Sequence, residues 1–139
     1  MKKLCMILSV IAILWMPILA CSKGDGGGTT PTPPAATEEN LRISTNASFL
    51  NVLPGAEFDF IVVVESKMPV NGVKIEYTVK GETDNVDYPQ GPAIETKETS
   101  KALKIVGIPR QKFCIVTVNV TSKTKASNIA STNFKVVYK

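Results

Sequence analysis

The chain has 139 residues, a formal net charge of +4 at pH 7 and no histidine. The absence of histidine excludes a Ser-His-Asp triad, a Cys-His pair and a histidine-ligated metal site, because each of them needs an imidazole. Acidic and basic residues are interspersed, which is typical of a solubilising surface and not of a nucleic-acid interface. We therefore expect a non-enzymatic protein that has no cofactor, no metal site and no nucleic-acid partner.

The N-terminal segment has the layout of a secretory signal. Two lysines at positions 2 and 3 precede an apolar run over residues 4–16. This run is shorter than the ~20 residues that a helix needs to span a bilayer. The sequence Ile18-Leu19-Ala20-Cys21 resembles the lipobox of bacterial lipoproteins. The resemblance implies cleavage before Cys21 and lipidation of its thiol, whereas an ordinary signal peptide and an uncleaved anchor are the alternatives.

Residues 22–40 predict a linker. Gly, Thr, Pro and Ala dominate this segment, and it contains no large apolar side chain. Such a composition cannot bury enough apolar surface to offset the entropy lost on ordering. The predicted organisation is therefore a signal peptide over residues 1–20, a lipidated cysteine and linker over 21–40, and one domain over 41–139.

Within the domain, apolar residues recur with a period of two, which predicts strands that each have one buried face. The expected strands cover residues 41–46, 49–53, 57–65, 72–80, 93–97, 101–108, 112–121 and 131–138, and the first two are open to being one broken edge strand. The expected inward residues are Phe58, Phe60, Val62, Val64, Val73, Ile75, Tyr77, Val79, Cys114, Val116, Val118, Val120, Phe134, Val136 and Tyr138. No segment has the pattern of an amphipathic helix.

About seven short strands in about 100 residues predict an all-β fold, an immunoglobulin-like antiparallel β-sandwich. The domain resembles the Ig-like modules of Bacteroidetes surface lipoproteins, and residues 133–139 look like a final strand of such a module. It departs from antibody domains, because the only tryptophan, Trp15, lies in the predicted signal. A small open barrel is the alternative fold.

The three cysteines have different expected fates. Cys5 leaves with the signal, Cys21 is lipidated, and Cys114 remains alone in the domain, so no intrachain disulfide is possible there. Cys114 has the parity of the inward-facing valines. We therefore expect a small buried hydrophobic side chain and not a nucleophile.

Two loops, at residues 81–92 and 108–112, hold the candidate binding residues. These residues are Asp84, Asp87, Tyr88 and Arg110. The acidic stretch 82–87 offers oxygen ligands for Ca²⁺ or a carboxylate pair for glycoside cleavage. Its spacing matches no calcium loop, and a polar turn between strands has the same appearance.

The expected function is that of a membrane-tethered module for adhesion, assembly or partner binding in the cell envelope. The lipid anchor implies the outer membrane, with the domain facing either the periplasm or the exterior, and a protein partner. One alternative is a carbohydrate-binding accessory lipoprotein of a glycan-uptake system, for which Tyr88 and Phe49 are the available exposed rings. The other alternative is an inhibitor of secreted hydrolases.

Overall fold

The computed structural model describes residues 37–139. The predicted signal peptide, Cys21 and the linker up to residue 36 lie outside the described residues. The described part is all-β, as predicted, and consists of β1 (Ile43–Thr45), β2 (Leu50–Leu53), β3 (Phe58–Val64), β4 (Val73–Gly81), β5 (Asp87–Tyr88), β6 (Ile94–Thr96), β7 (Ser100–Ile105), β8 (Phe113–Ser122) and β9 (Ile129–Tyr138). Residues 37–139 contain no helix that is long and apolar enough to cross a lipid bilayer.

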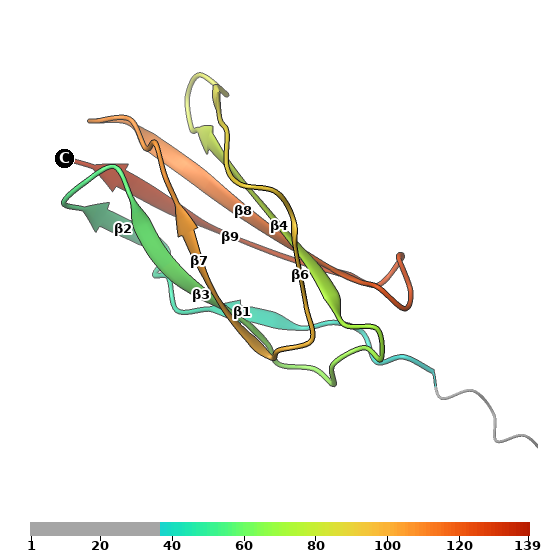
Figure 1. The fold of residues 1–139 in the computed structure, drawn as a ribbon. Coiled ribbons are helices and arrows are strands. Elements are labelled where there is room, and N and C mark those ends of the chain that lie inside the picture. Colours follow the sequence, from blue (N-terminus) through green and yellow to red (C-terminus); the bar gives the residue numbers. More distant parts are fainter. Residues whose placement is uncertain (1–36) are drawn as a thin grey trace, which may run out of the picture. The chain divides into compact units, whose positions relative to one another are not determined.

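The strands form two facing sheets (Figure 1). One sheet has the order β1-β3-β7, and the other has the order β2-β9-β8-β4-β5, with β6 also paired to β4. All of these pairs are antiparallel except β2 with β9, which is parallel. The chain changes sheets between β1 and β2, so the predicted broken edge strand is divided between the two layers. The predicted β-sandwich is confirmed.

The core lies between the sheets and follows the predicted parity. In β8, Cys114, Val116 and Val118 are fully buried, and the residues between them are partly exposed. Aromatic rings from both sheets meet in this layer: the Phe60 and Phe134 centroids lie 5.2 Å apart at an interplanar angle of 66°. Such edge-to-face pairs add about 0.5–1.5 kcal/mol beyond the burial of their surface. Since no disulfide is present among the described residues, apolar packing holds the two layers together.

Two local features differ from the predicted strands. The short strand β5, which pairs with the end of β4, falls in a segment that was expected to be a loop. Val137 has outward parity, yet only 3% of its surface is exposed. Its neighbours on the two adjacent strands are Val52 and Phe113, so apolar side chains flank it on the outer face of the sheet.

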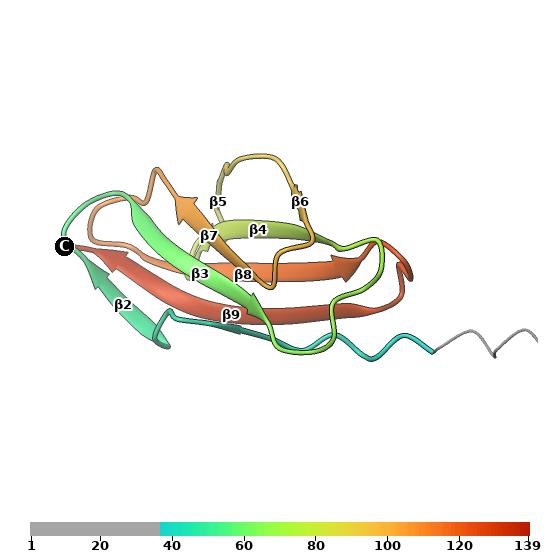
Figure 2. The same cartoon turned by 60° about the horizontal axis from the view of Figure 1, so that its bottom comes forward.

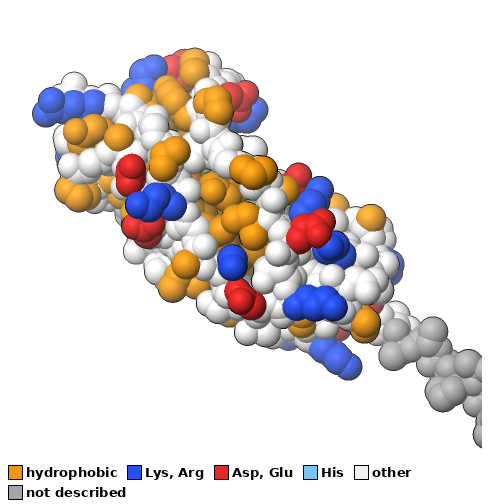
Figure 3. Space-filling model, viewed as in Figure 1, with side chains coloured by type: hydrophobic (Ala, Val, Ile, Leu, Met, Phe, Trp, Pro, Cys, Tyr) orange, Lys and Arg blue, Asp and Glu red, His pale blue; other side chains and the backbone are white. Residues whose placement is uncertain are grey.

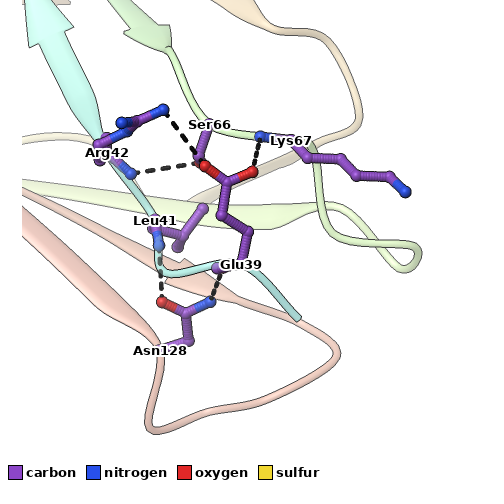
Figure 4. Close-up of polar contacts among 6 residues, drawn as sticks. All are labelled: Glu39, Leu41, Arg42, Ser66, Lys67 and Asn128. Atoms are coloured by element: carbon purple, nitrogen blue, oxygen red, sulfur yellow. Dashed lines mark hydrogen bonds and ion pairs between the residues drawn. The ribbon is translucent and has the colours of Figure 1, made fainter. Parts of the chain in front are cut away.

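The chain enters the sandwich through a set of polar contacts, which we call the entry clasp (Figure 4). The buried side chain of Asn128 accepts a hydrogen bond from the Leu41 amide (2.8 Å) and donates to the Glu38 carboxylate (2.6 Å) and the Glu39 carbonyl (2.8 Å). The Glu39 carboxylate accepts a hydrogen bond from the Lys67 amide at 3.1 Å. The folded domain therefore extends to at least Glu38, so it includes the last three residues of the segment whose composition predicts a linker.

Candidate functional site

The two predicted binding loops lie side by side, because an ion pair joins them. The Lys112 ammonium lies 2.6 Å from the Asp84 carboxylate, although 28 residues separate the two in the chain. The other Asp84 oxygen accepts a hydrogen bond from the Val86 amide at 3.2 Å, which closes a tight turn. The hydrogen bond to Lys112 holds the pKa of Asp84 below its usual value, and the same contact raises the pKa of Lys112.

Asp87 and Tyr88 form strand β5 and do not project from a free loop. The Asp87 carboxylate lies 3.3 Å from the ammonium group of Lys80, its neighbour on β4. Tyr88 pairs with Val79 and is partly buried against the core. The expectation that Tyr88 presents an open ring therefore does not match its position, because the β4–β5 pairing turns the ring toward the domain.

Arg110 lies in the turn before β8 and is exposed. Its backbone forms an isolated bridge with Tyr138, and the next amide, that of Gln111, donates to the Tyr138 carbonyl at 2.6 Å. Gln111 has a φ of 58°, a left-handed conformation that side chains other than glycine rarely adopt. This turn therefore fixes Arg110 beside the C-terminal end of β9.

The acidic loop does not assemble a cluster of metal ligands. Within residues 37–139, no three His, Cys, Asp or Glu side chains lie close enough together to hold a metal ion. Asp84 and Asp87 each have a lysine partner, at 2.6 Å and 3.3 Å respectively. A cation at this loop would therefore have to displace two existing ion pairs.

Cys114 occupies the predicted inward position. Its side chain is fully buried, and this burial raises the pKa of the thiol above its usual value. A reactive cysteine needs the opposite environment, with a lowered pKa and access to solvent. Cys114 therefore packs as a hydrophobic residue in β8.

Two hollows of the described surface lie at the end where the chain enters the sandwich. The first, of about 150 Å³, is lined by Thr37, Glu38, Glu39, Lys67, Met68, Pro69, Val70 and Thr124. The second is a more open depression beside Asn71 and Lys123. Neither is lined by a residue of the predicted binding loops.

An apolar surface was not among the predicted binding residues. It lies on the outer face of the six-stranded sheet, on β2 and the neighbouring ends of β8 and β9, and we call it the outer apolar patch. The patch consists of Phe49 (74% exposed), Leu50 (43%), Val52 (56%), Phe113 (47%) and the buried Val137. Figure 3 views the molecule from the side of β3 and β7, so the outer face of the six-stranded sheet is turned away from the viewer.

The signal that could have revealed the patch is the second apolar face of its strands. In β2, Leu53 faces the core, whereas the apolar Leu50 and Val52 face outward. In β9, Val136 faces the core, whereas the apolar Val137 faces outward. A single strand of this kind is read as buried on both faces. Only the register of β2, β8 and β9 brings these residues to one place.

A comparison of the chain with protein-family models, curated proteins and solved structures finds no match of any of the three kinds.

Proposed function

We propose that this chain is a lipid-anchored envelope protein whose single Ig-like domain binds a partner protein and catalyses no reaction. The observation that carries the proposal is the outer apolar patch. Four of its side chains are between 43% and 74% exposed: three belong to β2 and the residue before it, and Phe113 belongs to β8. The buried Val137 of β9 lies between Val52 and Phe113 and joins the two groups. Contiguous exposed apolar surface of this kind is typical of interaction sites on soluble domains.

The position of the patch fits a tethered binding module. The entry clasp involves Asn128, which immediately precedes β9, whereas Val137 lies nine residues further along the chain. At about 3.4 Å per residue, the two sites are ~31 Å apart along the strand. The first described residues and the patch therefore lie at opposite ends of the sandwich (Figure 1). An anchor at the N-terminal end would leave the patch accessible.

The tether itself rests on the sequence resemblance around Cys21. Fifteen residues separate Cys21 from Thr37, and a fully extended chain of that length spans at most ~50 Å. With Cys21 acylated, each buried methylene group of the lipid adds about 0.8 kcal/mol to membrane binding. Two or three acyl chains are sufficient for stable anchoring.

The Ig-like assignment is supported by the order of the strands. In Ig domains, the first, second and fifth strands share one sheet, and the third, sixth and seventh share the other. Here β1, β3 and β7 correspond to the former set, and β4, β8 and β9 correspond to the latter. The short strands β5 and β6 lie on the connection between β4 and β7.

Lipidation is tested by metabolic labelling of cells with an alkyne analogue of palmitate. We expect the native chain to be labelled and the Cys21→Ala variant to be unlabelled and released into the aqueous phase of a detergent extraction. The matched control is Cys114→Ala, which removes a buried thiol and should leave the label unchanged. Equal labelling of the native chain and Cys21→Ala would refute the lipid anchor.

Partner binding is tested by a photo-crosslinking amino acid placed at Phe113, in cells that carry the tethered chain. We expect one discrete adduct with an envelope protein. The control position is Ile129, which is 57% exposed on the same sheet but at the opposite end of β9. Identical adducts at both positions, or none at Phe113, would count against the patch as the binding site. Protease treatment of intact cells then reports which side of the membrane the domain faces.

Carbohydrate binding is a second candidate, favoured by one observation. The Phe49 ring is 74% exposed, and the Lys135 ammonium lies 5.6 Å from its centroid. An exposed ring beside a polar group suits the apolar face of a sugar. This role predicts that Phe49→Ala abolishes retention on a glycan array, while Tyr88→Ala does not.

A further inference from the structure

We infer that the free edge of β2 accepts an extended, acidic peptide segment of another protein, which adds to the six-stranded sheet as a further strand. The inference rests on the proposed role in partner binding and goes beyond it by naming the mode of binding and the chemistry of the partner. Strand addition combines main-chain hydrogen bonds, which give affinity, with side-chain contacts on alternate residues, which give specificity.

The backbone of β2 has one unused side. β2 is the end strand of its sheet and pairs only with β9 (Figure 2). The Lys135 amide donates to the Phe49 carbonyl at 2.8 Å, and the Lys139 amide approaches the Leu53 carbonyl at 3.5 Å. Because backbone direction alternates along a strand, the odd-numbered residues face β9. The N–H and C=O groups of Leu50 and Val52 therefore point to the free edge.

The edge strand β7 of the other sheet differs from β2, because side chains already bond its backbone and the residue after it. On β7, the Lys104 carbonyl accepts a hydrogen bond from the Tyr77 hydroxyl at 3.1 Å. Just beyond its end, the Gln90 side chain bonds both the amide and the carbonyl of Val106, each at 3.0 Å. β7 also carries Lys101 and Lys104, and such charges discourage pairing with another chain.

Within residues 37–139, neither charged residues nor side-chain hydrogen bonds block the free edge of β2. Its sequence, Leu50 to Leu53, contains no charged residue and no proline. Among the described residues, no side chain hydrogen-bonds the backbone of Leu50 or Val52, whereas the Asn51 side chain donates to the Lys135 carbonyl at 3.1 Å on the side of β9. An uncharged edge of this kind is a template for strand addition.

The side chains at this edge supply the apolar half of the site. Leu50 and Val52 are 43% and 56% exposed. Val52 adjoins Phe113 across Val137, and Leu50 lies beside Lys135. A strand added beside β2 would place every second side chain against this surface. Apolar residues at alternate positions of the partner would therefore be buried.

A cation next to the end of β2 favours an acidic partner. The Lys139 amide approaches the Leu53 carbonyl, and the Lys139 side chain forms no ion pair with another residue in the range 37–139. Arg110 also has no ion pair in this range, but it bridges Tyr138 on the side of β9 that faces away from β2. A carboxylate on the incoming strand would compensate the charge of Lys139. The β2 strand of a second copy carries no acid, so self-pairing would leave this charge uncompensated.

The test is an NMR titration of the domain with an acetylated peptide of alternating valine and threonine that ends in glutamate on both sides. We expect shift changes and slowed amide exchange at Leu50 and Val52. A peptide with lysine in place of glutamate should bind at least tenfold more weakly. Val52→Pro removes only an amide that faces the free edge, so it should preserve the fold and weaken binding at least tenfold.

The controls separate failure of this inference from failure of the proposed function. Ile129→Ala, at the far end of the same sheet, should bind the peptide normally. If Val52→Pro does not fold, Val52→Lys serves instead, because it adds a charge to the edge without changing the backbone.

Binding that is unaffected by these changes, or no binding at millimolar peptide, would overturn the inference. A concentration-dependent dimer that Val52→Lys abolishes would assign the edge to a second copy and would also overturn it. An adduct at Phe113 in cells without protection of Leu50 and Val52 would leave partner binding standing while strand addition fails.

Discussion

Replacing Val118 with aspartate should unfold the domain, whereas the same change at Thr117 should be tolerated. Val118 lies at the middle of β8, is fully buried, and pairs with Tyr77 on β4 and Thr132 on β9. Thr117 is adjacent in the chain but points to the outer face, opposite Thr78. The two positions share the same strand and the same backbone pairing, so they differ mainly in burial.

The magnitude follows from the burial of the side chain. Loss of the buried valine removes about 1.5–3 kcal/mol of hydrophobic stabilisation. A carboxyl group without a hydrogen-bond partner costs a further ~2–7 kcal/mol even when it is protonated. The total compares with about 5–15 kcal/mol for the stability of a whole domain. Val118→Asp should therefore leave the chain largely unfolded at 25 °C.

The assay is thermal and urea unfolding followed by circular dichroism. For Thr117→Asp we expect a loss within about 1 kcal/mol, which lowers Tm by roughly 4–8 °C in a domain of this size. Val118→Asp should show no cooperative transition. Similar melting curves for the two variants would refute the alternation of β8 and, with it, the buried position of Cys114.

Three further predictions concern polar and thiol groups. Asn128→Ala should lower the free energy of unfolding by about 3 kcal/mol, since three hydrogen bonds are lost and a buried amide is left unpaired; an unchanged urea midpoint would show that the entry clasp adds nothing. Cys114 should resist iodoacetamide at pH 8 until the domain is unfolded in urea, because the thiol is buried and its pKa is raised; rapid labelling of the native domain would contradict this. The lowered pKa of Asp84 means that its contribution to stability is present above the unfolded pKa of about 3.9 and is lost as the pH falls through the folded pKa. Asp84→Asn should therefore differ from the native domain at pH 7 and converge with it near pH 2, and a gap that is equal at both pH values would exclude the ion pair with Lys112 as its cause.

Much of the strand pattern could be predicted because it depends on local alternation. The inward residues of β8 are set by a period of two that is visible in the chain itself, and Cys114 falls in that series. A break between residues 46 and 49 was also visible, but the sequence left open whether the two segments form one edge strand, and the structure divides them between the two sheets. These features need only the geometry of a single strand and the preference of apolar side chains for the core.

The candidate binding residues were less predictable, because their environment depends on long-range pairing. Tyr88 was expected in a free loop, but pairing with Val79 on β4 makes it part of a sheet. The partner of Asp84 is Lys112, which lies in a different loop 28 residues away. Neither contact has a signal in the residues adjacent to it in the chain.

The sequence alone determined that the domain is an all-β sandwich, which faces of its long strands are buried, and that the described part holds no histidine chemistry. These properties follow from composition and from the two-residue repeat of a strand. Only the tertiary structure decided which strands became neighbours. The parallel pairing of β2 with β9 leaves a free, uncharged edge and gathers Phe49, Val52 and Phe113 on one face. Strand order is set by packing across the whole domain, and no local pattern carries that information.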